Sequence, residues 1–386
     1  MRIVHTSDWH AGRMWKNLRR LDELEAALGG MGDFVSREHV DLLLMSGDVF
    51  DNGAPVAEAE RLVFRFLRRM GEARVRTVII AGNHDSPARL QAWGGLAELA
   101  GVQVVARPQP ADRGGIVRFE TPRGERAVIA AVPFAATRDL VSAATLAKDE
   151  TVARQRYADG LREIVSHLCK HFDPDAVNLL MAHTHIEGAV LSGSEREVHV
   201  GEQWAAKAQA LPVDAHYVAL GHIHRPQALA AAPSPTEYAG SPIQLDFGEE
   251  GETKSFVVID AEPRRPVQIQ RIPYEGTKPL HTVRAGLPEL EERSAELRGS
   301  GWLRVRVPLD FPDPDLNSRV RRLLPNAVVV AVELPESPVA TDTRPASGSP
   351  PIDLFRAYFR DRHGGRDPDD ALVAAFDELI TQAKDE

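Results

Sequence analysis

The sequence predicts an α/β protein in which layered mixed sheets carry helices on their faces, followed by a small α+β unit and terminal helices. Over residues 1–134, apolar and β-branched runs such as Arg2–Thr6 alternate with segments of helical periodicity such as Leu18–Arg37. Strands that alternate with crossover helices favour a parallel or mixed sheet. Side chains that suit metal ions directly follow several of the strand-like runs. Because the C-terminal ends of parallel strands converge at one edge of a sheet, we expect the functional site there.

The alternation continues along the chain. Further strands are expected at 41–45, 77–81, 102–105, 116–120, 126–132, 177–182, 217–220, 236–239, 255–259 and 267–271. Further helices are expected at 58–72, 87–100 and 148–172. The last two strands are expected to close the unit as a hairpin, since the proline-containing segment Glu262–Pro266 separates them.

Composition and periodicity divide the chain into four segments. The α/β unit spans 1–275, and a β-α-β pattern within 277–336 predicts a compact accessory domain, with strands at 303–307 and 327–332 around a helix at 315–324. Residues 337–351 are rich in Pro, Ser and Thr, which is typical of a linker. Two amphipathic helices, 352–362 and 367–383, are expected within the closing segment 352–386, where Pro368 is placed to open the second.

Length and composition exclude several classes of protein. The chain has 386 residues, 43% hydrophobic and 26% charged, which suits a globular protein of two or three domains. No apolar run approaches the ~20 residues that span a bilayer, and Met1–His5 is a strand opening rather than a secretory signal, so we expect a cytoplasmic protein. The single Cys169 excludes an intramolecular disulfide and fits a reducing compartment. The net charge of −10 implies that any nucleic-acid binding is local or shared with a partner.

Short motifs place metal-type side chains directly after the apolar runs. Asp48 is the natural bridge between two ions because a carboxylate has two oxygens, and Asn83 offers a neutral carbonyl oxygen. Imidazole nitrogens suit transition metals better than magnesium, so the mixed donor set favours manganese, iron or zinc. Two ions ~3.5–4 Å apart can grip a phosphate, activate a water and stabilise in-line displacement. The candidate ligands are Asp8, His10, Asp48, Asn83, His183, His222 and His224.

Two other residues of these motifs are candidates for catalysis. His84 neighbours Asn83 but is expected to point past the metals to the substrate. There it could donate a proton to the leaving oxygen or steady the transition-state charge. Asp51 is placed to hydrogen-bond His84 and fix its tautomer, which is a common role for a carboxylate beside a metal site.

Each motif taken singly also has a simpler explanation. An Asp-x-His pair is common by chance, and Gly82–Asp85 could be a turn. Only the joint occurrence of the motifs, in this order and each after a strand, indicates a metal site. His185 is an alternative to His183, which we prefer because it directly ends the apolar run. His167 and His171 are four residues apart on a helix and could bind zinc, although solvated helix residues are the simpler interpretation.

Residues outside the motifs have competing interpretations. One basic segment is either a solvated helix face or a contact with a phosphate backbone, and it comprises Arg13, Lys16, Arg19 and Arg20. Arginines of the accessory unit could likewise flank a groove, namely Arg304, Arg306, Arg319, Arg321 and Arg322. The apolar faces of the terminal helices either pack on the body or dock to another protein, and they contain Leu354, Phe355, Tyr358, Phe359, Leu372, Phe376, Leu379 and Ile380.

The ordered set Asp-x-His, Gly-Asp-x-x-Asp, Gly-Asn-His-Asp, His and Gly-His-x-His resembles the calcineurin-like metallophosphoesterases. The sequence segments that contain or follow these motifs resemble one group within this superfamily, the bacterial SbcD nuclease subunits. These segments are Thr6–Arg13, Ser46–Asp51, Ala81–Ser86, Tyr217–His224 and Tyr238–Pro242. The resemblance runs through most of residues 1–275 and returns at 354–380, whereas 277–350 matches only in general layout.

The resemblance implies a manganese-dependent DNA nuclease with two Mn²⁺ ions per chain. It would act as a 3′→5′ exonuclease and an endonuclease on DNA ends and hairpins in repair. It would form a homodimer and work with SbcC, an ABC-type ATPase with a long coiled coil, in a two-plus-two assembly. The accessory unit would cap DNA, and the terminal helices would grip the base of that coiled coil. One metal would take Asp8, His10, Asp48 and His224, and the other Asp48, Asn83, His183 and His222.

Other classes of function stay open beside this one. A phosphatase or a cyclic-nucleotide phosphodiesterase would use the same fold, although Asp51 is followed by Asn52 rather than by the phosphate-holding arginine of the protein-phosphatase branch. Archaeal and eukaryotic nuclease relatives often carry a histidine at the position of Asp51, so the division of proton transfer between His84 and its neighbours is open. A non-catalytic scaffold that recruits the ATPase is disfavoured by the intact ligand set.

Overall fold

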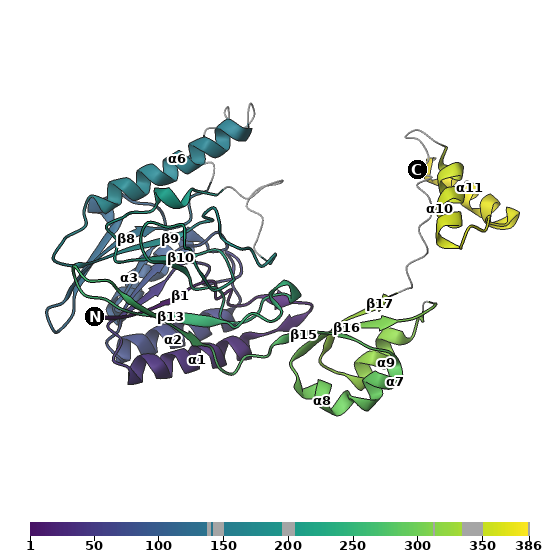
Figure 1. The fold of residues 1–386 in the computed structure, drawn as a ribbon, viewed down its shortest axis with the longest axis horizontal. Coiled ribbons are helices and arrows are strands. Elements are labelled where there is room, and N and C mark those ends of the chain that lie inside the picture. Colours follow the sequence, from purple (N-terminus) through teal and green to yellow (C-terminus); the bar gives the residue numbers. More distant parts are fainter. Residues whose placement is uncertain (137–139, 142–149, 195–204, 312, 334–349, 385–386) are drawn as a thin grey trace.

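The main body consists of two sheets packed face to face, with helices on their outer faces (Figure 1). The computed structural model describes residues 1–136, 140–141, 150–194, 205–311, 313–333 and 350–384. Both large sheets are six-stranded and contain parallel and antiparallel pairs. The expected α/β class with layered mixed sheets is therefore confirmed.

The first sheet has the order β14-β13-β1-β4-β5-β6. Its parallel strands are β1 (Arg2–Thr6), β4 (Leu42–Met45), β5 (Arg76–Ile80) and β6 (Val102–Val105). The expected hairpin is present as β13 (Ser255–Asp260) and β14 (Gln268–Pro273), with β13 antiparallel to β1. The helices that cover the outer face are α1 (Leu21–Arg37), α2 (Ala57–Glu72) and α3 (Pro87–Ala97).

The second sheet has the order β11-β12-β10-β9-β8-β7. Its parallel strands are β8 (Arg126–Val132), β9 (Val177–His183), β10 (Tyr217–Gly221) and β12 (Thr236–Tyr238). Antiparallel strands at its two edges are β7 (Ile116–Glu120) and β11 (Gln227–Ala228). Helix α6 (Glu150–Cys169) packs on the outer face through Leu161 and Val165.

Alternate side chains of the central strands serve two different cores. Ile3 and Leu44 of the first sheet pack between the sheets, against Ile129 and Met181 of the second. Val4, the residue after Ile3, points the other way into the core beneath the helices. Strands buried on both faces read as continuous apolar runs, which is why their positions could be predicted closely from the sequence.

The start of α1 differs from the expected helix over 18–37. Residues before it form a small hairpin of β2 (Met14–Trp15) and β3 (Leu18–Arg19), and α1 begins only at Leu21. The two turn residues, Lys16 and Asn17, have φ of 48° and 64°. Positive φ at both central positions is the geometry of a type I′ hairpin turn, which matches the twist of the flanking strands. The basic segment is therefore a hairpin rather than a helix face.

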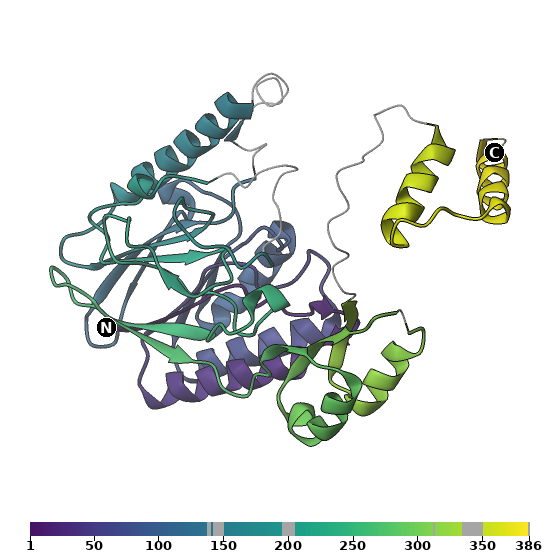
Figure 2. The same cartoon turned by 45° about the vertical axis from the view of Figure 1, so that its right-hand side comes forward.

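A smaller parallel sheet follows the main body (Figure 2). It comprises β15 (Leu280–Arg284), β16 (Trp302–Pro308) and β17 (Ala327–Glu333), with α7 (Leu287–Glu292), α8 (Ser294–Gly299) and α9 (Leu316–Leu323). Strands β16 and β17 and helix α9 lie where the sequence predicts them. The sequence pattern missed β15, α7 and α8, because β15 is an edge strand of five residues and each helix has six.

A buried polar network joins the small sheet to the main body. Arg20 and Glu23 form an ion pair at 2.7 Å whose side chains are 4% and 7% exposed. The indole Nε1 of Trp302 donates to Glu23 at 2.8 Å, and the main-chain N–H of Lys278 donates to Glu23 at 3.0 Å. The carboxylate of Glu23 therefore ties the start of α1 to the first residues of the smaller unit.

Replacing Glu23 by alanine is expected to lower the free energy of unfolding by about 3–5 kcal/mol, because Arg20 is then left buried without its counter-charge. Glu25 on the same helix is a matched control, since its ion pair with Arg65 is about half exposed on both sides. Glu25→Ala is expected to cost at most about 1 kcal/mol. Urea unfolding of the two variants provides the measurement, and equal losses would show that the Arg20–Glu23 pair is no stronger than a surface pair.

The chain ends in α10 (Pro351–Arg362) and α11 (Asp370–Lys384), which Figures 1 and 2 show apart from the sheets. Phe355 stacks on Phe376 with ring centroids 4.1 Å apart, so the two helices pack on each other. The expected linker, 337–351, lies outside the described residues except for its last two. Pro368 precedes α11 rather than opening it. In the described parts of the chain, none of the helices has the length and apolar character required for a membrane span.

Candidate metal centre

Five parallel strands of the two sheets end beside one another and deliver the candidate ligands. Asp8 and His10 follow β1, Asp48 follows β4, and Asn83 follows β5 in the first sheet. In the second sheet, His183 is the last residue of β9, and β10 is followed by the two remaining histidines, His222 and His224. The loops after these strands bring residues that are up to 216 positions apart in the sequence (224 − 8 = 216) to one edge of the fold.

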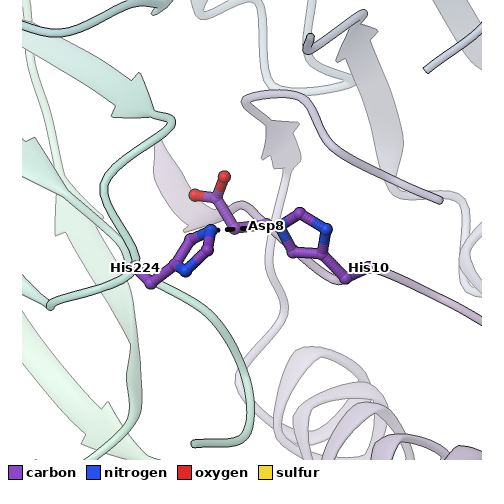
Figure 3. Close-up of side chains that lie close together, drawn as sticks. All are labelled: Asp8, His10 and His224. Atoms are coloured by element: carbon purple, nitrogen blue, oxygen red, sulfur yellow. Dashed lines mark hydrogen bonds between the residues drawn. The ribbon is translucent and has the colours of Figure 1, made fainter. Parts of the chain in front are cut away.

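One group of donors comprises Asp8, His10 and His224 (Figure 3). One ligand atom from each lies within 4.8 Å of those of the other two, and all three residues are buried. The Nε2 atoms of His10 and His224 are only 3.1 Å apart. Asp8 is held by the main-chain N–H of His222, which donates at 3.0 Å. These atoms converge as the ligands of one cation would.

A second group of donors surrounds the amide oxygen of Asn83. This Oδ1 atom is 2.9 Å from Nε2 of His183 and 2.9 Å from Nδ1 of His222. Asp48 lies between the two groups, because its Oδ2 atom is 3.7 Å from Nε2 of His10 and 3.5 Å from Nε2 of His183. All the candidate ligands are thus gathered in one place, with Asp48 between the two groups of donors.

Strained backbone and glycine allow this close approach. Asp8, His10 and Asp48 all have positive φ, between 45° and 54°, which is uncommon for residues with a side chain and is often found at functional sites. At Gly47, with φ of 92°, a Cβ atom would lie 2.4 Å from Nδ1 of His183. At Gly82 it would lie 2.1 Å from the carboxylate of Asp48. The two glycines are therefore required for His183 and Asp48 to reach the site.

The electrostatics of the site fit a divalent metal. Burial raises the pKa of Asp8 to about 6. Burial also opposes ionisation of Asp48, but His183 and His10 outweigh it and hold the pKa of Asp48 well below its usual value. For His183, burial disfavours the cation, but Asp48 outweighs it and raises the pKa to about 9. The buried carboxylates therefore favour a positive charge close to them. A divalent cation would supply that charge when it binds the deprotonated ligands.

His84 lies beside the ligands, but its contact with Asp51 differs from the expected one. Its Nδ1 atom is 2.7 Å from the main-chain carbonyl of Asp51, not from the carboxylate. The carboxylate of Asp51 instead lies 3.5 Å from Nδ1 of His10 and 3.8 Å from Arg13. The expected side-chain hydrogen bond to His84 is therefore wrong, because the backbone after β4 presents its carbonyl to His84 and its side chain to His10.

The four residues of the basic segment differ in their exposure because of the hairpin. Lys16 and Arg19 are exposed, and Arg13 is partly exposed. Arg20 is only 5% exposed, because it pairs with Glu23 and donates to the carbonyl of Gln244. Arg20 thus belongs to the buried junction and not to a surface available to a phosphate.

The roles of two buried residues near the site, Asp85 and Glu249, were not anticipated from the sequence. Asp85 accepts main-chain hydrogen bonds from Gly82 at 2.9 Å and Phe50 at 3.0 Å, which ties the loops after β4 and β5 together. Glu249 is fully buried, and its carboxylate lies 3.4 Å from Nδ1 of His224. Only its tertiary contacts distinguish Glu249, since Glu250 and Glu252 follow it closely in the sequence and have the same side chain.

The fold and this cluster of donors define a metal-dependent phosphoesterase. Residues 1–226 match the model of the calcineurin-like phosphoesterase family, and 276–363 match that of the type 5 capsule protein repressor C-terminal domain. The SbcD component of the nuclease SbcCD of Bacillus subtilis is 31% identical over 393 residues, covering 100% of this chain and 99% of the relative. The SbcD components of the same nuclease in Rhodobacter capsulatus and Escherichia coli K12 are 31% and 28% identical, covering 92% and 84% of this chain and 92% and 82% of theirs.

A solved dimetal phosphatase from Danio rerio is 11% identical, with a TM-score of 0.40, and covers 71% of this chain and 99% of its own. The chain belongs to the SbcD nuclease family of the calcineurin-like superfamily. It is accordingly a metal-dependent phosphodiesterase of the nuclease type.

Proposed function

We propose that this chain is the manganese-dependent nuclease component of an SbcCD-type complex. It hydrolyses DNA phosphodiesters with two metal ions, as a 3′→5′ exonuclease and as an endonuclease, and processes DNA ends and hairpins in repair, recombination and replication. The observation that carries the proposal is the convergence of buried carboxylate, amide and imidazole donors at the strand ends, in a chain similar along its whole length to the SbcD component of nuclease SbcCD.

We assign the donors to two metal positions that share Asp48. Asp8, His10 and His224 complete the first position, and Asn83, His183 and His222 complete the second, which agrees with the two groups of short distances. When bound, a divalent metal pair supplies Lewis acidity toward the scissile phosphate and eases deprotonation of the attacking water. Imidazoles in both positions favour manganese over magnesium.

His84 is assigned as the proton donor to the leaving oxygen. A carbonyl oxygen can only accept, so Nδ1 of His84 carries a proton toward Asp51, and Nε2 is the atom left to hold or release a second one. The main-chain N–H of His84 donates to Asp48 at 2.8 Å, which fixes this histidine relative to the proposed bridging ligand. Asp51 acts as a positioning residue, through its carbonyl on His84 and its carboxylate on His10.

We assign DNA contacts to Lys16 and Arg19 of the hairpin, which are exposed, and to Arg13 just before it, which is partly exposed. Lys16 also lines a groove with Phe247 and Arg304, in which the guanidinium of Arg304 lies 4.2 Å from the Phe247 ring centroid. This groove runs between the hairpin and β16 of the smaller unit. It supports a role of residues 277–336 in holding DNA against the main body. DNA phosphates would contact basic side chains there, although the net charge of the chain is −10.

We assign 337–351 to a linker and 352–386 to binding of the SbcC-type ATPase at its coiled coil. Exposed apolar side chains of α10 and α11 support this role, since Leu354, Tyr358, Leu372 and Leu379 are 41–64% exposed. The proposed assembly contains two copies of each chain, with this one as a homodimer. The single Cys169 is consistent with a reducing, cytoplasmic setting.

Cleavage of labelled single-stranded and hairpin DNA by the purified chain tests the proposal. We expect cutting with Mn²⁺, weaker cutting with Mg²⁺ and none with EDTA. Hydrolysis of small phosphomonoesters or cyclic nucleotides that far exceeds DNA cleavage would instead identify a phosphatase or cyclic-nucleotide phosphodiesterase. If neither substrate is cut, the assay is repeated with SbcC and ATP, and inactivity there would overturn the proposed function.

A further inference from the structure

A charged network lies behind His224, on the side away from the other donors. Glu249 is the last residue of the short helix Phe247–Glu249 and is fully buried. Its Oε2 atom lies 2.7 Å from the ammonium of Lys254 and accepts the main-chain N–H of Leu245 at 2.9 Å. A buried carboxylate that accepts from two donors and pairs with an ammonium is held in its ionised form.

Ser194 bridges this carboxylate to His224. The hydroxyl of Ser194 donates to Oε1 of Glu249, and its oxygen is 2.7 Å from Nδ1 of His224. A hydroxyl has a single proton to donate, and an ionised carboxylate can only accept. The proton of Ser194 is therefore committed to Glu249, and the serine oxygen accepts from Nδ1–H of His224. In the neutral imidazole, this arrangement places the lone pair on Nε2.

The Nε2 atom of His224 is the one that faces the proposed metal position, 3.1 Å from Nε2 of His10. We propose that Glu249, acting through Ser194, is a positioning residue that sets the tautomer and orientation of His224 for metal binding. This inference rests on the proposed two-metal site and deepens it, because it assigns one metal position a dependence on a residue that does not touch the metal.

The two proposed metal positions differ in this respect. In the second position, Nδ1 of His183 faces the main-chain carbonyl of Ser46 at 2.8 Å, so the backbone sets its tautomer. Nδ1 of His222 itself faces Asn83 and is the donor atom there. The effect of Glu249 is therefore confined to the position that His224 shares with Asp8 and His10.

Replacing Glu249 by glutamine reverses the polarity of the bridge. The amide oxygen is required at the Oε2 position, where Lys254 and Leu245 donate, so the amide NH₂ group faces Ser194. The serine oxygen then accepts from that NH₂ group and turns its own proton to Nδ1 of His224. This favours the tautomer with a proton on Nε2, which opposes metal binding.

The experiment measures binding of Mn²⁺ to the metal-free full-length chain by isothermal titration calorimetry, with thermal unfolding in parallel. In Glu249→Gln, one of two Mn²⁺ equivalents is expected to bind about 10–100-fold more weakly, and the other is expected to be unchanged. Ser194→Ala leaves Glu249 facing Nδ1 directly at 3.4 Å, so the same equivalent should weaken less. Ser194→Ala keeps the ion pair between Glu249 and Lys254. It therefore still tests the inference if Glu249→Gln does not fold.

Glu252→Gln is the matched control, because Glu252 also pairs with Lys254, at 2.8 Å, while its Oε1 atom accepts from Ser192 at 3.3 Å. Its two Mn²⁺ equivalents are expected to match the wild type. The inference is overturned if both test variants bind Mn²⁺ like the wild type. It is also overturned if the two Mn²⁺ equivalents weaken equally in a test variant, or if the control variant weakens as much as the test variants, because either result indicates a purely structural role. If the wild-type chain itself binds no Mn²⁺, the proposed function fails instead.

Discussion

His84→Gln is expected to reduce the proposed Mn²⁺-dependent DNA cleavage by about 10²–10⁴-fold while both proposed metal ions stay bound. Glutamine cannot deliver a proton to the leaving oxygen, but it leaves every assigned ligand in place. The main-chain N–H that donates to Asp48 is also retained. Cleavage rates and the Mn²⁺ content of the purified variant are measured on the same preparation.

The metal content decides between two roles for His84. Its ring lies within reach of His10 and Asp48, with ligand atoms of all three within 4.8 Å of one another. Loss of a metal ion from His84→Gln would therefore make it a ligand and contradict its assignment as proton donor. His167→Gln makes the same chemical change on an exposed residue of α6 and is expected to leave both measurements unchanged. Residual cutting by His84→Gln also reveals any contaminating nuclease.

Truncation after Ala340, a residue outside the described ranges, is expected to abolish association with an SbcC-type ATPase and leave the metal centre intact. The truncation removes α10 and α11, which pack on each other through Phe355 and Phe376. Co-purification with the ATPase measures association, and Mn²⁺ binding by the truncated chain reports on the site. Co-purification equal to that of the full chain would refute the assigned role of the terminal helices.

A point substitution separates loss of the docking surface from loss of the segment. Leu379 is 64% exposed on α11, so Leu379→Asp places a charge on the apolar surface without removing a buried contact. This variant is expected to weaken co-purification, because a desolvated charge at an apolar interface is costly. Glu378→Gln, at the neighbouring exposed position, is the matched control and is expected to bind like the wild type.

The parts of the fold that follow from local pattern were predicted closely. Strands β1, β6, β7 and β8 have the bounds expected from their apolar runs, and β9 and β10 each extend one residue further. The cluster at the strand ends followed from the same pattern, since a residue that directly follows a parallel strand must lie at that edge of the sheet. His183 illustrates this, because ending the apolar run distinguished it from His185.

The parts that depend on side-chain partners were not predictable from pattern. The local sequence does not distinguish Arg20 from Arg19. Arg20 is buried because it pairs with Glu23, which also accepts a hydrogen bond from Trp302, a residue far along the chain. Whether the carboxylate of Asp51 lies against His10 or against His84 depends on how one loop turns after β4. Hydrophobic periodicity carries no information on such choices, because the direction of a single side chain leaves the period unchanged.

The sequence by itself determined the class of fold, the identity of the metal-type donors and their delivery to one sheet edge. These features depend on burial and strand direction, which can be inferred from the order of apolar and polar residues along the chain. Only the tertiary structure decided which donor atoms lie within a few ångströms of one another, and that Ser194 and Glu249 contact His224 at Nδ1. Ligand geometry and the tautomer of a histidine depend on contacts of a few ångströms between residues far apart in sequence, and those distances exist only once the two sheets have packed together.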